Sequence, residues 1–138
     1  GVPVVYYGEE IGMPGAGDPD NRRMMRFDSE LNDGEKTFHK KMQILIRLRT
    51  QYSALALGDW QGIYEDETVN VWEKSYFDEK ILIVFNHSPS PKSVEFNVNS
   101  ESAFLESLLN DRSTSAGMGW VSLELAPYDT QFYLVHQK

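Results

Sequence analysis

The fold is indicated first by the run Val2-Pro-Val-Val-Tyr-Tyr7, which is followed directly by Gly8. Its residues are mostly β-branched or aromatic and do not alternate with polar ones, a pattern typical of a strand covered on both faces. Such strands occur in parallel sheets, where each strand needs neighbours. The run therefore predicts a buried strand of an α/β fold.

A long irregular segment separates this run from the next regular one. Residues 8–36 are rich in Gly, Pro and charged side chains, and loops of this length in compact proteins are usually functional. Asn32 followed three residues later by Glu35 is the pattern of a helix N-terminus. Apolar side chains then recur at helical spacing, which predicts an amphipathic helix of about four turns: Phe38, Met42, Leu45, Ile46 and Tyr52.

The hydrophobic period changes to two after Gly58. Apolar residues alternate with polar ones in 69–71, 93–98 and 121–125, and residues 81–85 are apolar throughout. Short alternating segments separated by turn residues predict an antiparallel β-sandwich. The fold class expected from these patterns is mixed α and β, with a boundary near 54–58.

The residues at the start of the chain also resemble a known family. Gly1-Val-Pro-Val-Val-Tyr-Tyr-Gly-Glu-Glu-Ile-Gly-Met13, followed by Gly17-Asp-Pro-Asp-Asn-Arg-Arg-Met-Met25, resembles the last strand and following loop of the α-amylase family, glycoside hydrolase family 13. Cyclodextrin glucanotransferases and cyclomaltodextrinases share these motifs. The later helix, with Leu48-Arg49, Ala54-Leu55 and Gly58, is similar to the family's final barrel helix and its exit.

This resemblance implies a domain arrangement. Residues 1–56 would be the C-terminal end of a catalytic TIM barrel, with its last strand, loop and helix, and 57–138 a C-terminal all-β domain. The chain would then be a fragment of a longer protein, consisting of the last βα unit of a truncated barrel followed by an antiparallel β-sandwich.

The resemblance also implies an activity. The family acts on α-1,4-glucans such as starch, maltooligosaccharides and cyclodextrins by a retaining mechanism, with an Asp nucleophile, a Glu acid/base and a second stabilising Asp. Those residues lie on earlier strands, and no position of this sequence matches their motifs. We therefore expect no catalytic residue here, and an inactive fragment of an active hydrolase or transglucosylase. The alternative is a non-catalytic β-sandwich that binds α-glucan or serves a structural role.

Two residues are candidates for substrate binding. Asp18 and Arg22 match the Asp and Arg of the family's Asp-Pro-x-Asn-Arg loop, which binds a glucose unit on the donor side of the cut. A carboxylate can accept hydrogen bonds from vicinal sugar hydroxyls while a guanidinium donates to others. The alternative is that the two side chains pair with each other and brace the loop.

Other residue types have mainly structural interpretations. Glu9 and Glu10 are adjacent at a predicted strand end and would face opposite sides, so we expect no catalytic pair, and we expect Glu10 to brace backbone or an arginine. The acidic loop lacks the spacing of a calcium site, and we predict neither a metal nor a cofactor. We expect the aromatic residues of the β region to form core or interstrand contacts rather than a sugar platform: Trp60, Tyr64, Trp72, Tyr76 and Trp120.

Charge and composition limit the partners. With Lys+Arg 13 against Asp+Glu 21 in 138 residues, the net charge is −8, which argues against a nucleic-acid surface. No apolar run approaches the roughly 20 residues of a membrane helix. The resemblance implies an α-glucan as partner of the intact enzyme and export to the periplasm or medium, with cytoplasmic members also known in the family. We further expect self-association of this fragment through residues 2–7.

Overall fold

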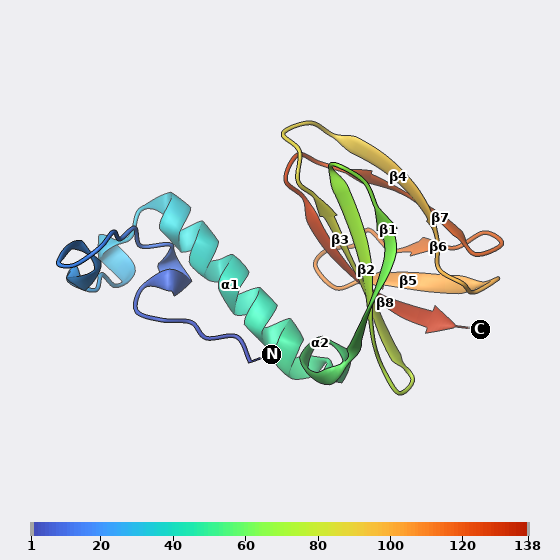
Figure 1. Cartoon of the computed structure of the whole chain (residues 1–138), viewed down its shortest axis with the longest axis horizontal. Helices are drawn as coiled ribbons and strands as arrows, with labels where there is room; N and C mark the ends of the chain where they lie inside the picture. The colour runs from blue at the N-terminus through green and yellow to red at the C-terminus, as the bar shows by residue number, and fades with distance from the viewer. Residues whose placement is uncertain (1, 138) are drawn as a thin grey trace. The chain divides into compact units, whose positions relative to one another are not determined.

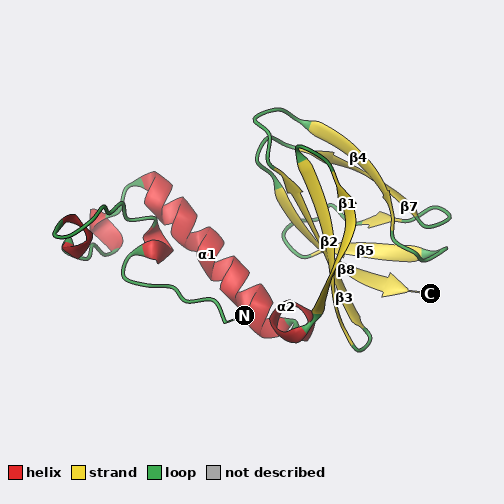
Figure 2. Ribbon diagram, in the orientation of Figure 1, coloured by secondary structure: helices red, strands yellow, loops and turns green. Residues whose placement is uncertain are grey.

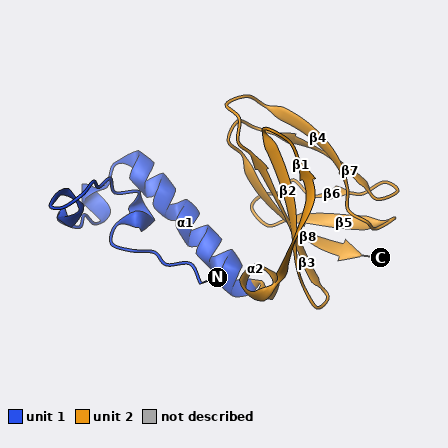
Figure 3. Cartoon of the chain, viewed as in Figure 1, with its two compact units in different colours: residues 1–51 blue, residues 52–138 orange. Residues whose placement is uncertain are grey.

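The computed structural model describes residues 2–137 and divides the chain into two compact units, residues 1–51 and 52–138 (Figures 1 and 3). The division lies before the boundary expected at residues 56 and 57. The reason is the short helix α2 (Ser53–Leu57), which contacts strands β2 and β3. The backbone amide of Ala54 also donates to the Glu79 carboxylate at 2.5 Å, so this helix forms part of the second unit.

The strand predicted at residues 2–7 is not formed in the structure. These residues are extended chain without strand pairing, and Val2, Val4 and Tyr6 are between 73% and 88% exposed. A strand requires a neighbouring strand for its backbone hydrogen bonds, and the described part of the first unit offers none. The backbone amide of Tyr6 instead donates to Glu9 Oε2 at 3.0 Å. The prediction of a buried strand is therefore wrong for this chain.

The first unit is organised by helix α1 (Asp33–Gln51). Short 3-10 turns precede it at Glu9–Ile11, Asp20–Arg22 and Asp28–Glu30, and the first of these contacts α1. The predicted N-terminal pattern is confirmed: Asn32 Oδ1 accepts from the Glu35 amide at 3.0 Å, and Glu35 Oε2 accepts from the Asn32 amide at 2.9 Å. This reciprocal pair satisfies amides that have no partner inside the helix.

The second unit is almost entirely β-structure (Figure 2). The strand order in the larger sheet is β1-β2-β3-β8-β5-β6, and β4 and β7 form a smaller sheet, with every strand pair antiparallel. The strand bounds are β1 Asp59–Glu65, β2 Val69–Tyr76, β3 Glu79–Asn86, β4 Lys92–Asn97, β5 Ala103–Ser107, β6 Thr114–Ser115, β7 Trp120–Leu125 and β8 Thr130–Gln137.

The core of this unit is shared by the two sheets. Inward side chains come from β2, β3, β4, β5, β7 and β8, among them Leu82, Phe96, Leu105, Val121 and Tyr133, each no more than 2% exposed. Full burial of one side chain of this size contributes about 1.5–3 kcal/mol of transfer free energy. The alternation predicted for β4 and β7 is confirmed by the burial of every second residue.

The mixed α and β class with mainly antiparallel sheets is thus confirmed. In residues 2–137, no helix is both long and apolar enough to cross a bilayer.

Candidate functional site

The two predicted substrate-binding residues lie on the loop before α1. The 3-10 turn Asp20–Arg22 is closed by the Asp20 amide donating to Gly17 O at 3.0 Å and the Arg22 amide donating to Pro19 O at 3.1 Å. This turn brings Arg22 Nη2 within 3.0 Å of Asp18 Oδ2. The side chains are 59% exposed at Asp18 and 76% exposed at Arg22, so both remain open to solvent while paired.

Further contacts hold this loop in place. Arg23 pairs with Asp20 at 2.6 Å, and the other Asp20 oxygen accepts from the Ala16 amide at 3.0 Å. The Tyr7 hydroxyl donates to Arg23 O at 2.7 Å, which ties the loop to the segment that precedes it. The Asp18 and Arg22 side chains therefore project from a braced backbone.

The far end of the loop is anchored to the start of α1. Arg26 forms a two-pronged ion pair with Glu35, with Nη1 to Oε2 at 3.1 Å. The hydrogen bond from the Asn32 backbone amide, followed by the Arg26 guanidinium, holds the pKa of Glu35 below its usual range. Glu35 thus links the helix cap and the loop through one carboxylate.

Glu9 and Glu10 occupy a 3-10 turn rather than the strand end expected from the sequence. Glu9 Oε2 accepts from the Tyr6 amide, and Glu10 Oε2 accepts from the Gly8 amide, each at 3.0 Å. Gly8 has a positive φ of 88° that a residue with a Cβ rarely adopts. Both carboxylates therefore brace the turn, which agrees with the structural role predicted for Glu10.

The aromatic residues of the second unit differ from the prediction. Trp60 and Trp120 are 59% and 52% exposed, so neither lies in the core, although Trp60 makes the interstrand contact that was the other part of the expectation, edge-on against Trp72. Tyr64 packs partly against the core, and Trp72 is half-buried between two other rings, with centroids 5.4 Å from Trp60 and 5.3 Å from Phe85. The solvent-facing indoles make this unit a second candidate surface for ligand binding.

The signal for Trp120 was present in the sequence. Residues 120–125 alternate, and the buried members are Val121, Leu123 and Leu125. Trp120 therefore shares the outward face with Ser122 and Glu124, since side chains two apart in a strand point the same way. The aromatic character of Trp120 favoured a place in the core, whereas the alternation of residues 120–125 favoured an exposed position.

No protein-family model matches the chain. A cyclomaltodextrinase from Geobacillus thermopakistaniensis (strain MAS1) is 34% identical over 137 residues, covering 98% of this chain and 23% of the relative. Neopullulanase 2 from Thermoactinomyces vulgaris is 32% identical over 133 residues, covering 93% and 22% respectively.

A solved structure agrees with these relatives. The α-amylase from Geobacillus thermoleovorans, determined in complex with acarbose, superposes with a TM-score of 0.85 at 28% identity, covering 100% of this chain and 30% of that one. The chain belongs to the α-amylase family, glycoside hydrolase family 13, and corresponds to the C-terminal part of its members. It spans less than a quarter of the length of the two curated relatives.

Proposed function

We propose that the chain is the C-terminal part of an enzyme that acts on α-1,4-glucans with retention of configuration. The proposed substrates are starch, maltooligosaccharides or cyclodextrins. In this proposal residues 1–56 complete the last βα unit of a catalytic TIM barrel, and residues 57–138 form a β domain that stabilises it. The names of the relatives support it, because cyclomaltodextrinase, neopullulanase and α-amylase are all enzymes of α-glucan chemistry.

The observation that carries the proposal furthest is the geometry of Asp18 and Arg22. The pair is formed on a braced loop, and both side chains are more than half exposed. In an intact barrel, loops that follow the carboxyl ends of the strands build the active site. A braced carboxylate and guanidinium in such a loop would orient one glucose unit through its hydroxyl groups and lose little side-chain entropy on binding.

The same proposal assigns no catalytic role to this chain. A retaining glycosidase needs a nucleophilic carboxylate and a separate acid/base carboxylate about 5–5.5 Å apart. Glu9 and Glu10 are used by the backbone amides of Tyr6 and Gly8, and the remaining carboxylates of the loop are paired with arginines or lie at its turns. We therefore expect the 138-residue chain alone to release no sugar.

The decisive experiment compares the complete reading frame that contains these residues with the 138-residue chain. Both proteins are assayed for release of reducing sugar from soluble starch and from β-cyclodextrin. Activity in the complete protein and none in the short chain would support the proposal. A complete protein that is folded yet inactive on every α-glucan offered would overturn it.

A further inference from the structure

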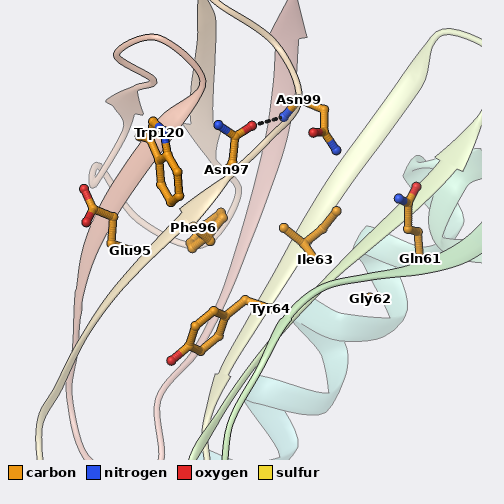
Figure 4. Close-up of a pocket in the computed structure, with 9 residues that line it drawn as sticks. All are labelled: Gln61, Gly62, Ile63, Tyr64, Glu95, Phe96, Asn97, Asn99 and Trp120. Atoms are coloured by element: carbon orange, nitrogen blue, oxygen red, sulfur yellow. Dashed lines mark hydrogen bonds between the residues drawn. The ribbon is translucent and has the colours of Figure 1, made fainter.

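A hollow of about 420 Å³ opens in the second unit between strand β1 and the small sheet of β4 and β7 (Figure 4). β1 is an edge strand of the larger sheet, and β4 and β7 pair only with each other in the described residues. The volume lies in the range of small-molecule sites, which is about 300–1,000 Å³. Polar and apolar groups both line the hollow, including Ile63, Tyr64, Asn97, Asn99 and Trp120.

The hollow lies where β1 is irregular. The pairing of β1 with β2 shifts between Gly62 and Tyr64, which is a β-bulge. Such bulges bend a strand and redirect its side chains. Gly62 pairs with Trp72, and directly paired residues point to the same face of a sheet, so a side chain at position 62 would lie on the face of Trp60 and Trp72, and Gly62 lines the hollow through its backbone.

The aromatic part of the wall comes from Trp120 and Tyr64. Trp120 is 52% exposed, although it stands next to the buried Val121 in β7. Tyr64 is held by its hydroxyl, which donates to Asp66 Oδ2 at 2.7 Å, and this hydrogen bond raises the pKa of Tyr64. The exposed Trp120 indole and the Tyr64 ring offer apolar faces at separate places in the hollow (Figure 4), and the Tyr64 ring is held by its hydrogen bond.

The polar part of the wall has unused hydrogen-bonding groups. Asn97 is the direct pairing partner of Trp120, and its Oδ1 accepts from the Asn99 amide at 2.8 Å (Figure 4). The Gln61, Glu95 and Asn99 side chains line the hollow without a hydrogen-bond or ion-pair partner in the described residues. Side-chain amides both donate and accept, as sugar hydroxyls do.

The charge of the lining limits the class of ligand. No Lys, Arg or His is among the described residues that line the hollow, and Glu95 carries the one formal charge there. An anionic ligand such as a phosphate would therefore find no counter-charge. A neutral polyhydroxylated ligand matches both the amides and the aromatic faces.

We propose that this hollow is a binding site for a linear oligosaccharide. One sugar ring lies on Trp120, and hydroxyls along the oligosaccharide are bonded by Asn97, Asn99 and Gln61. The choice of an α-1,4-linked glucan rests on the proposed function, whereas the neutral sugar class rests on the hollow itself. The site is carried by the second unit alone and uses none of the loop that holds Asp18 and Arg22.

The test is a titration of the 138-residue chain with maltotriose, followed by ¹⁵N-¹H NMR, with cellotriose as the β-linked comparison. We expect saturable shifts centred on the Trp120 indole N–H and on the Asn97 and Asn99 side-chain amides. Trp120→Ala should weaken binding about tenfold or more, because it removes the stacking face, whereas Trp120→Phe should retain most of it. Tyr128→Ala is the matched control, since Tyr128 is 69% exposed and lies outside the hollow.

A second variant tests the polar wall rather than the Trp120 ring. Gln61→Ala removes a side-chain amide that lines the hollow and has no hydrogen-bond partner in the described residues, so it should weaken maltotriose binding about two- to tenfold without lowering the thermal midpoint. Absence of shifts at Trp120, or unchanged affinity in both Trp120→Ala and Gln61→Ala, would overturn the site. Equal affinity for cellotriose would overturn the α-glucan assignment. An inactive complete protein whose Trp120 still binds maltotriose would refute the proposed function and leave this site standing.

Discussion

Arg22 Nη2 donates to Asp18 Oδ2 at 3.0 Å, and the two side chains are 76% and 59% exposed. The two side chains therefore pair with each other, which is the alternative that the sequence left open. An exposed ion pair contributes only about 0–1 kcal/mol, because solvent screens the charges and the side chains lose entropy. The same exposure leaves the remaining donors and acceptors of both groups available to a ligand.

The first prediction concerns stability. Asp18→Ala and Arg22→Ala, each made in the 138-residue chain, should lower the free energy of unfolding by less than about 1 kcal/mol. The double variant should show a coupling of similar or smaller size. Urea unfolding followed by circular dichroism measures all three. A loss above about 2 kcal/mol for either single variant would mean that the pair holds the loop by contacts beyond the ion pair.

The second prediction concerns substrate binding in the complete enzyme. Asp18→Asn and Arg22→Ala should each lower kcat/KM for maltooligosaccharides by about 10- to 100-fold, the value of a hydrogen bond to a charged group. Initial-rate kinetics give the measurement. Asp111→Asn is the control, because Asp111 is an exposed carboxylate of the second unit. Unchanged kcat/KM in both loop variants would refute the subsite assignment while leaving the family membership intact.

The third prediction concerns the start of α1. Asn32→Ala removes the acceptor of the Glu35 amide and should cost about 1 kcal/mol of unfolding free energy. Asn32→Asp retains an acceptor oxygen at the same place and should restore most of the loss. Thermal unfolding of the two variants, monitored at the helical circular-dichroism band, compares them. Equal loss in both variants would contradict the capping role.

The fourth prediction concerns pH. Asp66 accepts from the Tyr64 hydroxyl and from the Thr68 and Val69 amides, and these bonds hold the pKa of its carboxyl well below the usual 3.8. A carboxyl with a lowered folded pKa stabilises the fold above its unfolded pKa, and the contribution is lost as the pH falls toward the folded value. Asp66→Asn should therefore be less stable than the parent at pH 7.

The measurement for Asp66 is the difference in unfolding free energy between parent and Asp66→Asn across pH 2–7. The difference should be constant down to about pH 4 and shrink below it. Glu95→Asn is a suitable comparison, because Glu95 has no partner in the described residues. A difference that grows on acidification would have the wrong sign for this carboxylate.

The sequence patterns predicted contacts between residues close together in the chain, and they missed features that depend on distant segments. The helix cap at Asn32 and Glu35 is made by residues three apart, so its pattern predicted the contacts themselves. The alternation of β4 and β7 predicted burial, because each residue's face is set by the strand period. The hollow beside Trp120 was not predicted, since it depends on a bulge in β1 and on the approach of two sheets.

The segment 2–7 shows the opposite case, in which the pattern was clear and the structure differs. A run of β-branched and aromatic residues is typical of a strand that is covered on both faces. Pairing, however, is a property of neighbouring strands, and in the described first unit no strand lies beside it. The composition of residues 2–7 indicated a buried strand, whereas in this chain the segment is exposed and is not part of a sheet.

The last prediction follows from that mismatch. Val2, Val4 and Tyr6 are 88%, 78% and 73% exposed, and the extended segment around Val2 and Val4 is not paired with a strand in the described residues, so it can pair with a second copy. We expect the 138-residue chain to self-associate with a concentration-dependent sedimentation coefficient, and Val4→Lys to reduce this association. Phe77→Lys, at an 86% exposed position of the second unit, should leave it unchanged. Monomeric sedimentation at all concentrations, or equal effects of the two lysines, would show that residues 2–7 do not mediate contact between copies. Association that Val4→Lys alone abolishes would mean that the run retains its preference for strand pairing and fulfils it between chains.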